Sequence, residues 1–185
     1  NSGTYSIYVD NALKVSSTNG SFTSTATRPM WIGQFSYALS NIEFFDGEID
    51  DVRLYSDVLT AQEVGYIYND TTASIPTDNL TAYYEFEGNA LNTAPLGKFG
   101  QAAIFNGSNS KITITDSNLK RTVYSVSFWI NADDYTKSTE SVVNMGLDNT
   151  GGSWGGLAFG INNDKVFYYG GDVTGVGGTG FFTQT

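Results

Sequence analysis

Residues 44–69 constrain the fold more than any other stretch, because they predict a strand, a turn and a capped helix in succession. Alternation over residues 49–55 indicates a strand with two distinct faces. One face carries Asp50, Val52 and Leu54, and the other carries Ile49, Arg53 and Tyr55. A strand that leads directly into a short helix is typical of the closing part of a β-sandwich domain.

The helix that follows is predicted over Ala61–Tyr68 from its own capping residues. Thr60 is placed to cap the amide of Glu63, and Glu63 is placed to reach back to Thr60, as in a capping box. Leu59 before the cap and Val64 inside the helix have the spacing of a hydrophobic staple. Asn69, which tolerates a left-handed conformation, is the expected end of the helix.

Composition indicates an all-β protein and excludes several classes of function. The chain has twelve Tyr, twelve Phe and 21 Gly, which favour strands and turns. Its net charge of −10, with only 9 Lys and Arg, argues against nucleic acid and anionic membrane surfaces as partners. Without Cys or His, disulfides, thiolate chemistry, a Ser-His-Asp triad and ordinary zinc sites are excluded.

Short strands separated by Gly, Asn and Asp turns follow along the rest of the chain. Asp10 and Asn11 fit a tight hairpin turn, and Asn162, Asn163 and Asp164 a second one. Residues 73–79 are a polar connector at which the chain restarts. The further strands are predicted at 5–9, 13–15, 30–35, 82–86, 101–106, 111–115, 125–130, 142–145, 157–161 and 166–169, with an apolar segment from 181. This spacing predicts a β-sandwich or jelly roll.

Two parts of the chain resemble a known family. Residues 83–89 (YYEFEGN), 100–107 (GQAAIFNG) and 127–129 (SFW) resemble the opening of concanavalin A-like, laminin G-like domains, and residues 5–68 resemble their closing half. The resemblance implies an all-β, jelly-roll-like sandwich with one short helix, in which the two halves occur in permuted order. We therefore divide the chain into a C-terminal half at 1–72, a linker at 73–79 and an N-terminal half at 80–185.

The permuted order allows two arrangements. In a tandem array, 1–72 closes one repeat and 80–185 opens the next, which is the arrangement that we favour from the sequence. Alternatively, the two halves pack together as one permuted or swapped sandwich. In either case the open sheet edges need completion. The chain does not begin with Met and shows no signal peptide or long apolar run, so we expect a piece of a larger exported or surface-displayed protein.

Catalysis is not expected. Residues 47–53 resemble the acidic strand of retaining glycosidases on this fold, which need two carboxyl groups about 5 to 5.5 Å apart. Glu48 and Asp50 share a face, but Val52 and Arg53 follow in place of a second acid. The acid/base partner is missing, and a structural role for Asp50 is the simpler interpretation.

Binding of sugar is the function that the resemblance implies, through an aromatic platform with Asn and Asp hydrogen bonds. Trp154, flanked by glycines, is the first candidate for the platform, followed by Tyr168 and Tyr169, with Asn162 as a polar partner. For Trp31 and Trp129 we favour a core position, since both lie in apolar strands.

Calcium is the one metal that the composition leaves open, because oxygen ligands are abundant. Asp148, Asn149 and Asp164 are the candidate ligands, provided that their loops converge at one end of the sandwich. The alternative is that they are solvated turn residues.

The sequence thus predicts a non-enzymatic carbohydrate-binding or adhesion module of a larger cell-surface, secreted or virion protein. Its expected partners are a glycan or a surface protein and other copies or repeats of the same protein, without nucleic acid and without membrane insertion. The alternative is a structural repeat that builds a fibre or filament by edge completion between copies.

Overall fold

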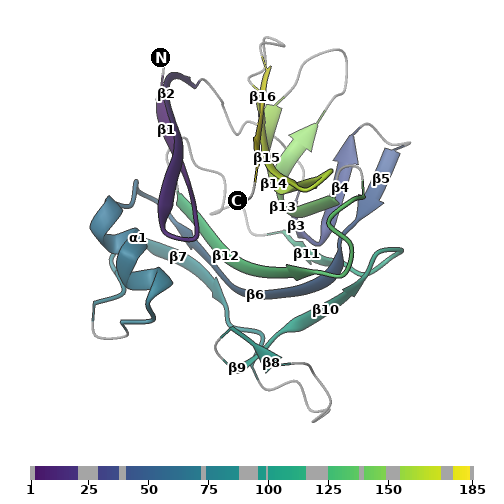
Figure 1. The fold of residues 1–185 in the computed structure, drawn as a ribbon, viewed down its shortest axis with the longest axis horizontal. Coiled ribbons are helices and arrows are strands. Elements are labelled where there is room, and N and C mark those ends of the chain that lie inside the picture. The colour runs from purple at the N-terminus through teal and green to yellow at the C-terminus, as the bar shows by residue number, and fades with distance from the viewer. Residues whose placement is uncertain are drawn as a thin grey trace.

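The computed structural model describes residues 3–20, 29–37, 41–71, 74–87, 96–98, 100–115, 125–137, 140–148, 155–171 and 177–183. Antiparallel strands dominate these residues, and one helix, α1 (Ala61–Tyr68), interrupts them (Figure 1). The strands are β1 (Gly3–Val9), β2 (Ala12–Gly20), β3 (Met30–Ile32), β4 (Gln34–Tyr37), β5 (Asn41–Phe44), β6 (Asp46–Tyr55), β7 (Leu80–Tyr84), β8 (Leu96–Gly97), β9 (Gly100–Gln101), β10 (Ala103–Asn106), β11 (Ile112–Ile114), β12 (Ser125–Ala132), β13 (Glu140–Asp148), β14 (Gly155–Asn162), β15 (Lys165–Gly171) and β16 (Gly177–Thr183).

Two sheets form the main layers. The curved sheet at the bottom of Figure 1 has the order β10-β6-β12, and β7 also pairs with β6. The sheet above it has the order β11-β3-β13-β14-β15-β16. The buried core combines side chains of both sheets: Ile49, Val52 and Leu54 of β6, Phe105 of β10 and Ala132 of β12 with Met30, Ile32, Val142, Val143, Met145 and Ile161. The predicted all-β sandwich with one short helix is confirmed.

The two halves of the chain share both sheets. In the lower sheet, β6 from the first half pairs with β7, β10 and β12 from the second half. In the upper sheet, β3 lies between β11 and β13. In this structure the halves therefore pack on each other, as in the permuted sandwich, the arrangement that the sequence ranked second. The division at 72 and 80 stays a prediction.

Local turn and cap chemistry agrees with the sequence. Asp10 and Asn11, with φ of 49° and 61°, join β1 to β2. The Thr60 hydroxyl accepts from the amide of Glu63 at 3.3 Å, and the Glu63 carboxylate accepts from the Thr60 amide at 2.7 Å. The predicted capping box is therefore confirmed. Asn69 ends the helix with φ of −90°, and the left-handed residue is Asp70, at 48°, one position later than expected.

The predicted strand at 30–35 is in fact two strands. Gly33 breaks it with φ of +79°, so that β3 joins the upper sheet while β4 pairs with β5. A Cβ at Gly33 would lie 2.1 Å from Cδ1 of Phe105, so only glycine fits this close approach. The segment Asn41–Phe44 also forms a strand that the sequence did not indicate.

The face assigned to Ile49 from simple alternation is wrong. Asp50 lies opposite Trp129 and Arg53 opposite Ser127, so β6 has one residue more than β12 across this stretch. Asp51 has φ of 51°, a conformation that Asp tolerates. The bulge shifts the alternation by one position, and Ile49 joins Val52 in the core.

Trp129 does not lie in the core between the sheets. Its ring packs on Tyr68 of α1, with centroids 5.2 Å apart, and Lys98 Nζ lies 4.7 Å from the Trp129 centroid. The strand β12 therefore faces the core with Val126, Phe128 and Ile130, and faces α1 with Trp129. Trp31 is half-buried between the buried Met30 and Ile32.

We expect Ile49→Ala to lower the free energy of unfolding by about 2 to 5 kcal/mol, because Ile49 is fully buried. Ile104→Ala is the matched control, since Ile104 is 61% exposed on the neighbouring strand β10 and should change stability by less than about 0.5 kcal/mol. Chemical denaturation monitored by tryptophan fluorescence measures both. Equal losses in the two variants would contradict the bulge that turns Ile49 inward.

Candidate functional site

Of the three aromatic residues predicted to bind sugar, two are neighbours on β15 and one lies outside the described residues. Tyr168 is half-buried, packs on the core and meets Tyr5 of β1, with ring centroids 4.8 Å apart and the two hydroxyls hydrogen bonded. Tyr169 lies on β15 opposite Ala158, and only its backbone is described. Trp154 lies outside the described residues. Tyr168 therefore contributes to the packing of the hairpin β1–β2 against β15.

The polar candidates are partly brought together by the turn between β14 and β15. Asn162 ends β14 and accepts from the side-chain amide of Asn163 at 2.7 Å. Asn163 and Asp164 have φ of 47° and 60°, as expected for this turn. Their amides donate to the carbonyls of Lys137 and Tyr135 at 3.0 and 2.8 Å. The turn is thus fixed by backbone bonds to the segment that follows β12.

Two of the three predicted calcium ligands have side chains outside the described part of the structure. Asp148 ends β13, with only its backbone described, and Asn149 lies outside the described residues. Asp164 is exposed. Among the described side chains, no group of three or more acidic residues is arranged to hold a metal ion. Calcium binding at these residues stays a prediction.

The acidic strand compared with glycosidases faces different surroundings at each position. Glu48 accepts a hydrogen bond from Asn131 at 3.3 Å, and Asp50 is 3% exposed. Val52 is fully buried in the core. After the carboxylates of Glu48 and Asp50, the next of the compared positions on β6 is therefore an apolar core residue, Val52.

A buried polar network stands on β6 at the bulge. Asp51 Oδ1 accepts from Tyr83 Oη at 2.5 Å and from Arg53 Nη2 at 3.2 Å, and Arg53 Cζ lies 4.2 Å from the Tyr83 ring centroid. Burial raises the pKa of Asp51, against the lowering effects of Tyr83 and Arg53. Burial and the bond to Asp51 raise the pKa of Tyr83. Asp51 and Arg53 form an ion pair on β6, and the hydroxyl of Tyr83 on β7 is hydrogen bonded to both, which fixes β7 on β6.

A second group of charges lies at the start of β13. Glu140 is 3% exposed, and Lys137 Nζ lies 3.3 Å from its Oε1 and 2.5 Å from Asp46 Oδ2. Burial raises the pKa of Glu140, against the lowering effect of Lys137. Burial, and then the charge of Glu140, raise the pKa of Glu43 on β5. Lys137 thus faces two carboxylates, Asp46 and Glu140, while Glu43 interacts with Glu140, and both glutamates hold protons more strongly than usual.

A groove of about 440 Å³ lies beside α1, and hydrogen bonds position both of its walls. The segment before α1 is held on β12, because Ser125 Oγ accepts from the amide of Leu59 and donates to the carbonyl of Asp57, each at 2.9 Å. The segment after α1 is held by Thr71, whose amide donates to Tyr66 O at 3.0 Å and whose carbonyl accepts from Ser74 N at 2.7 Å. Hydrogen bonds thus tie the segments on both sides of α1 to the rest of the fold.

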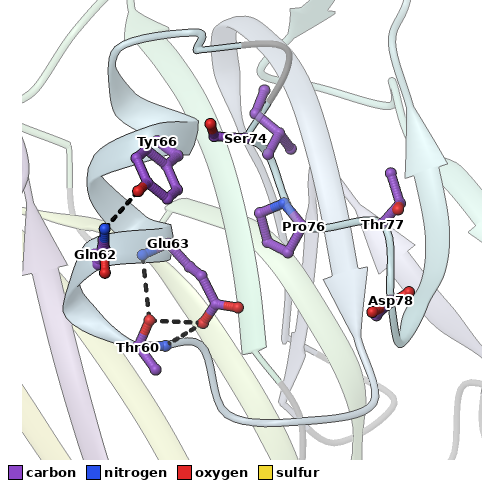
Figure 2. Close-up of a pocket in the computed structure, with 9 residues that line it drawn as sticks. Thr60, Gln62, Glu63, Tyr66, Ser74, Pro76, Thr77 and Asp78 are labelled. Atoms are coloured by element: carbon purple, nitrogen blue, oxygen red, sulfur yellow. Dashed lines mark hydrogen bonds between the residues drawn. The ribbon is translucent and has the colours of Figure 1, made fainter.

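The walls combine one aromatic ring with many hydrogen-bonding groups. The helix wall carries Thr60, Gln62, Glu63 and Tyr66, and the opposite wall carries Ser74, Ile75, Pro76, Thr77 and Asp78. Figure 2 shows the Pro76 ring across from Glu63, with Asp78 at the far end of the same wall. Gln62 donates to the Tyr66 hydroxyl, which orients the ring on the helix. The lining is thus mostly polar, with Tyr66, Ile75 and Pro76 as its apolar part.

The sequence did not indicate this groove. The sequence indicates only a connector at residues 73–79, whereas residues 74–78 line the groove beside α1, and Asn79 O accepts from the amide of Ser56 at 2.8 Å. The available signal was a capped helix with a polar face, followed by a segment that contains Pro76. It gave no measure of the distance between the two walls.

We expect the Glu43–Glu140 pair to make the protein less stable at pH 7 than at pH 5. Both carboxyls have a folded-state pKa above the ordinary value of 4.5, so the folded state holds protons that the unfolded state has released. Stability is therefore lost as the pH rises through the raised values. Glu43→Gln and Glu140→Gln should each reduce the difference in Tm between pH 5 and pH 7.

Calorimetry at the two pH values measures this difference, and the exposed Glu85 gives the control variant Glu85→Gln. An unchanged difference in both pair variants, or an equal reduction in the control, would contradict the role of the pair.

Comparison with known proteins gives one match. The described residues contain no helix long and apolar enough to cross a membrane. Searches of curated proteins and of solved structures found no match. Residues 1–65, which contain β1 to β6 and the start of α1, match the family model described as the concanavalin A-like lectin/glucanases superfamily, and this confirms the resemblance to concanavalin A-like, laminin G-like domains over that part of the chain.

Proposed function

We propose that this chain is a non-enzymatic carbohydrate-binding or adhesion module of a larger surface, secreted or virion protein, and that the groove beside α1 receives the saccharide. The family match to lectins and glucanases supports carbohydrate as the ligand class. The observation that carries the proposal is the position of Tyr66 in a groove otherwise lined mostly by polar side chains.

The chemistry of the groove fits a sugar ring. A pyranose has an apolar face that stacks on an aromatic ring and hydroxyls at its edge that need hydrogen-bond partners. Tyr66 provides the ring, and Ile75 and Pro76 add half-buried apolar surface opposite it. Gln62 and Asp78 provide polar groups on the two walls. A ligand bound here needs no rearrangement of the sheets, because hydrogen bonds already hold both walls.

A non-enzymatic role agrees with the arrangement of the acids on β6. The position after Glu48 and Asp50 on this strand is the core residue Val52, and Arg53 is bound to Asp51 and Tyr83. Hydrolysis of a glycoside by two carboxyl groups would need an acid and a nucleophile at a defined separation in an accessible site. Asp50, with 3% exposure, is not accessible to a polysaccharide.

The test is binding to a glycan array by the chain and by two variants at Tyr66. Tyr66→Ala should weaken binding about tenfold or more, since it removes the stacking ring, while Tyr66→Phe keeps the ring and should lose much less. Trp154→Ala is the competing variant, because Trp154 is the platform expected from the sequence. Loss of binding in Trp154→Ala but not in Tyr66→Ala would contradict the groove and favour the loop.

A structural role in a fibre or filament is the second proposal. The hairpin β1–β2 forms a two-stranded sheet that shares no ladder with the other described strands, and an isolated hairpin is marginally stable in water. A neighbouring copy that pairs with this hairpin would complete it. Concentration-dependent polymerisation without glycan, measured by light scattering, would favour this role, and a monomer at all concentrations would argue against it.

A further inference from the structure

The charges of the groove are all of one sign. Of the nine residues that line it, Glu63 and Asp78 are acidic and none is basic. The Glu63 carboxylate accepts from the amide and the hydroxyl of Thr60, both at 2.7 Å, and these bonds lower its pKa. Glu63 is therefore ionised at neutral and mildly acidic pH. The chain as a whole has a net charge of −10, which adds to the negative potential at the groove.

The capping box leaves part of Glu63 for a ligand. Both capping bonds use Oε2. Figure 2 shows the other carboxylate oxygen pointing away from Thr60, toward the wall that carries Pro76 and Asp78. An ionised carboxylate can only accept hydrogen bonds, so a partner at this oxygen must bring an O–H or N–H group. Asp78 places a second carboxyl group on the opposite wall.

We propose that the groove selects uncharged saccharides, whose hydroxyls donate to Glu63 and Asp78, and rejects sulfated and carboxylated ones. This inference rests on the proposed function and names the ligand class of the same site. A sulfate or carboxylate has no proton to donate at neutral pH, and in this groove it would face the carboxylate of Glu63 on the helix wall and the carboxyl group of Asp78 on the opposite wall. Like charges placed opposite one another oppose binding strongly.

The experiment compares neutral and anionic members of matched glycan pairs. The probes are dextran and dextran sulfate, and N-acetyllactosamine repeats with and without 6-O-sulfate, added to the glycan array and measured at 0.15 M salt. The chain should bind the neutral member of a recognised pair at least about tenfold more tightly than the sulfated member. Equal or tighter binding of the sulfated member would overturn the proposal.

The double variant Glu63→Gln/Asp78→Asn tests whether the groove itself causes the selection. Gln at the third helical position still completes a capping box, so the helix wall keeps its start. This variant should bind the neutral glycan more weakly than the unmodified chain does, because an amide oxygen is a poorer acceptor than a carboxylate, and its preference over the sulfated member should fall below about threefold. An unchanged preference would overturn the proposal.

The matched control is Glu85→Gln/Asp133→Asn, which removes two exposed charges that do not line the groove. It should keep the full preference of the unmodified chain. A preference lost equally in the control would assign the selection to the net charge of the chain and overturn the assignment to the groove.

The outcomes separate this inference from the function on which it rests. Binding of glycans through Tyr66 with a preference for the sulfated members would leave the carbohydrate-binding module intact and reject only the selection. The absence of binding to every neutral and anionic glycan on the array would reject both.

Discussion

The structure depends on a single extra residue in β6, the strand on which most of the lower sheet is built. This strand pairs with β12 along one side and with β10 and β7 along the other. A regular strand would alternate its faces over this whole length and turn Ile49 away from the side chains of Val52 and Leu54. The bulge at Asp51 allows all three to enter the core. It also places Asp51 beside Arg53 and Tyr83, so the polar network and the apolar core are consequences of one backbone feature.

The sequence predicted best those features, such as caps and turns, that depend only on residues a few positions apart. The capping box of α1 and the turn at Asp10 and Asn11 follow from side chains within a few residues of each other, and both were correct. The break at Gly33 depends on Phe105, more than seventy positions later, whose ring occupies the space of a side chain at Gly33. The face of Ile49 likewise depends on how β12 lies against β6. Alternation within one strand contains no information about such partners.

The same limit explains why the sequence did not predict the residues of the candidate site. The sequence predicts Trp154 as a sugar platform because a tryptophan between glycines has no obvious core role. It predicts Tyr168 because one of two adjacent tyrosines must face outward. In the structure, Tyr168 is engaged by Tyr5, which lies in the other half of the chain. The groove instead combines a helix face with residues that had been assigned only as a linker. Residue types alone indicate which side chains suit a sugar, whereas the tertiary contacts decide which of them share a cavity.

The pairing of the two halves also bears on the choice between a folded module and a fibre. The edges by which β6 accepts β7, β10 and β12 from its own chain are the same edges that it would offer to a second copy. The connector at residues 73–79 decides whether β6 pairs within its own chain or with a second copy. A short connection favours pairing within the chain, because it gives the intramolecular partner a high effective concentration. Here the described residues 74–79 are not a free tether, since they pack along α1 and bond to Ser56 at the end of β6. Both walls of the groove belong to this local unit, as does β7, which begins directly after residue 79, so the groove persists whether β10 and β12 come from the same chain or from a neighbour. Binding at the groove and completion of the sheets are therefore compatible in one protein, and a fibre built from such copies would present one groove per chain.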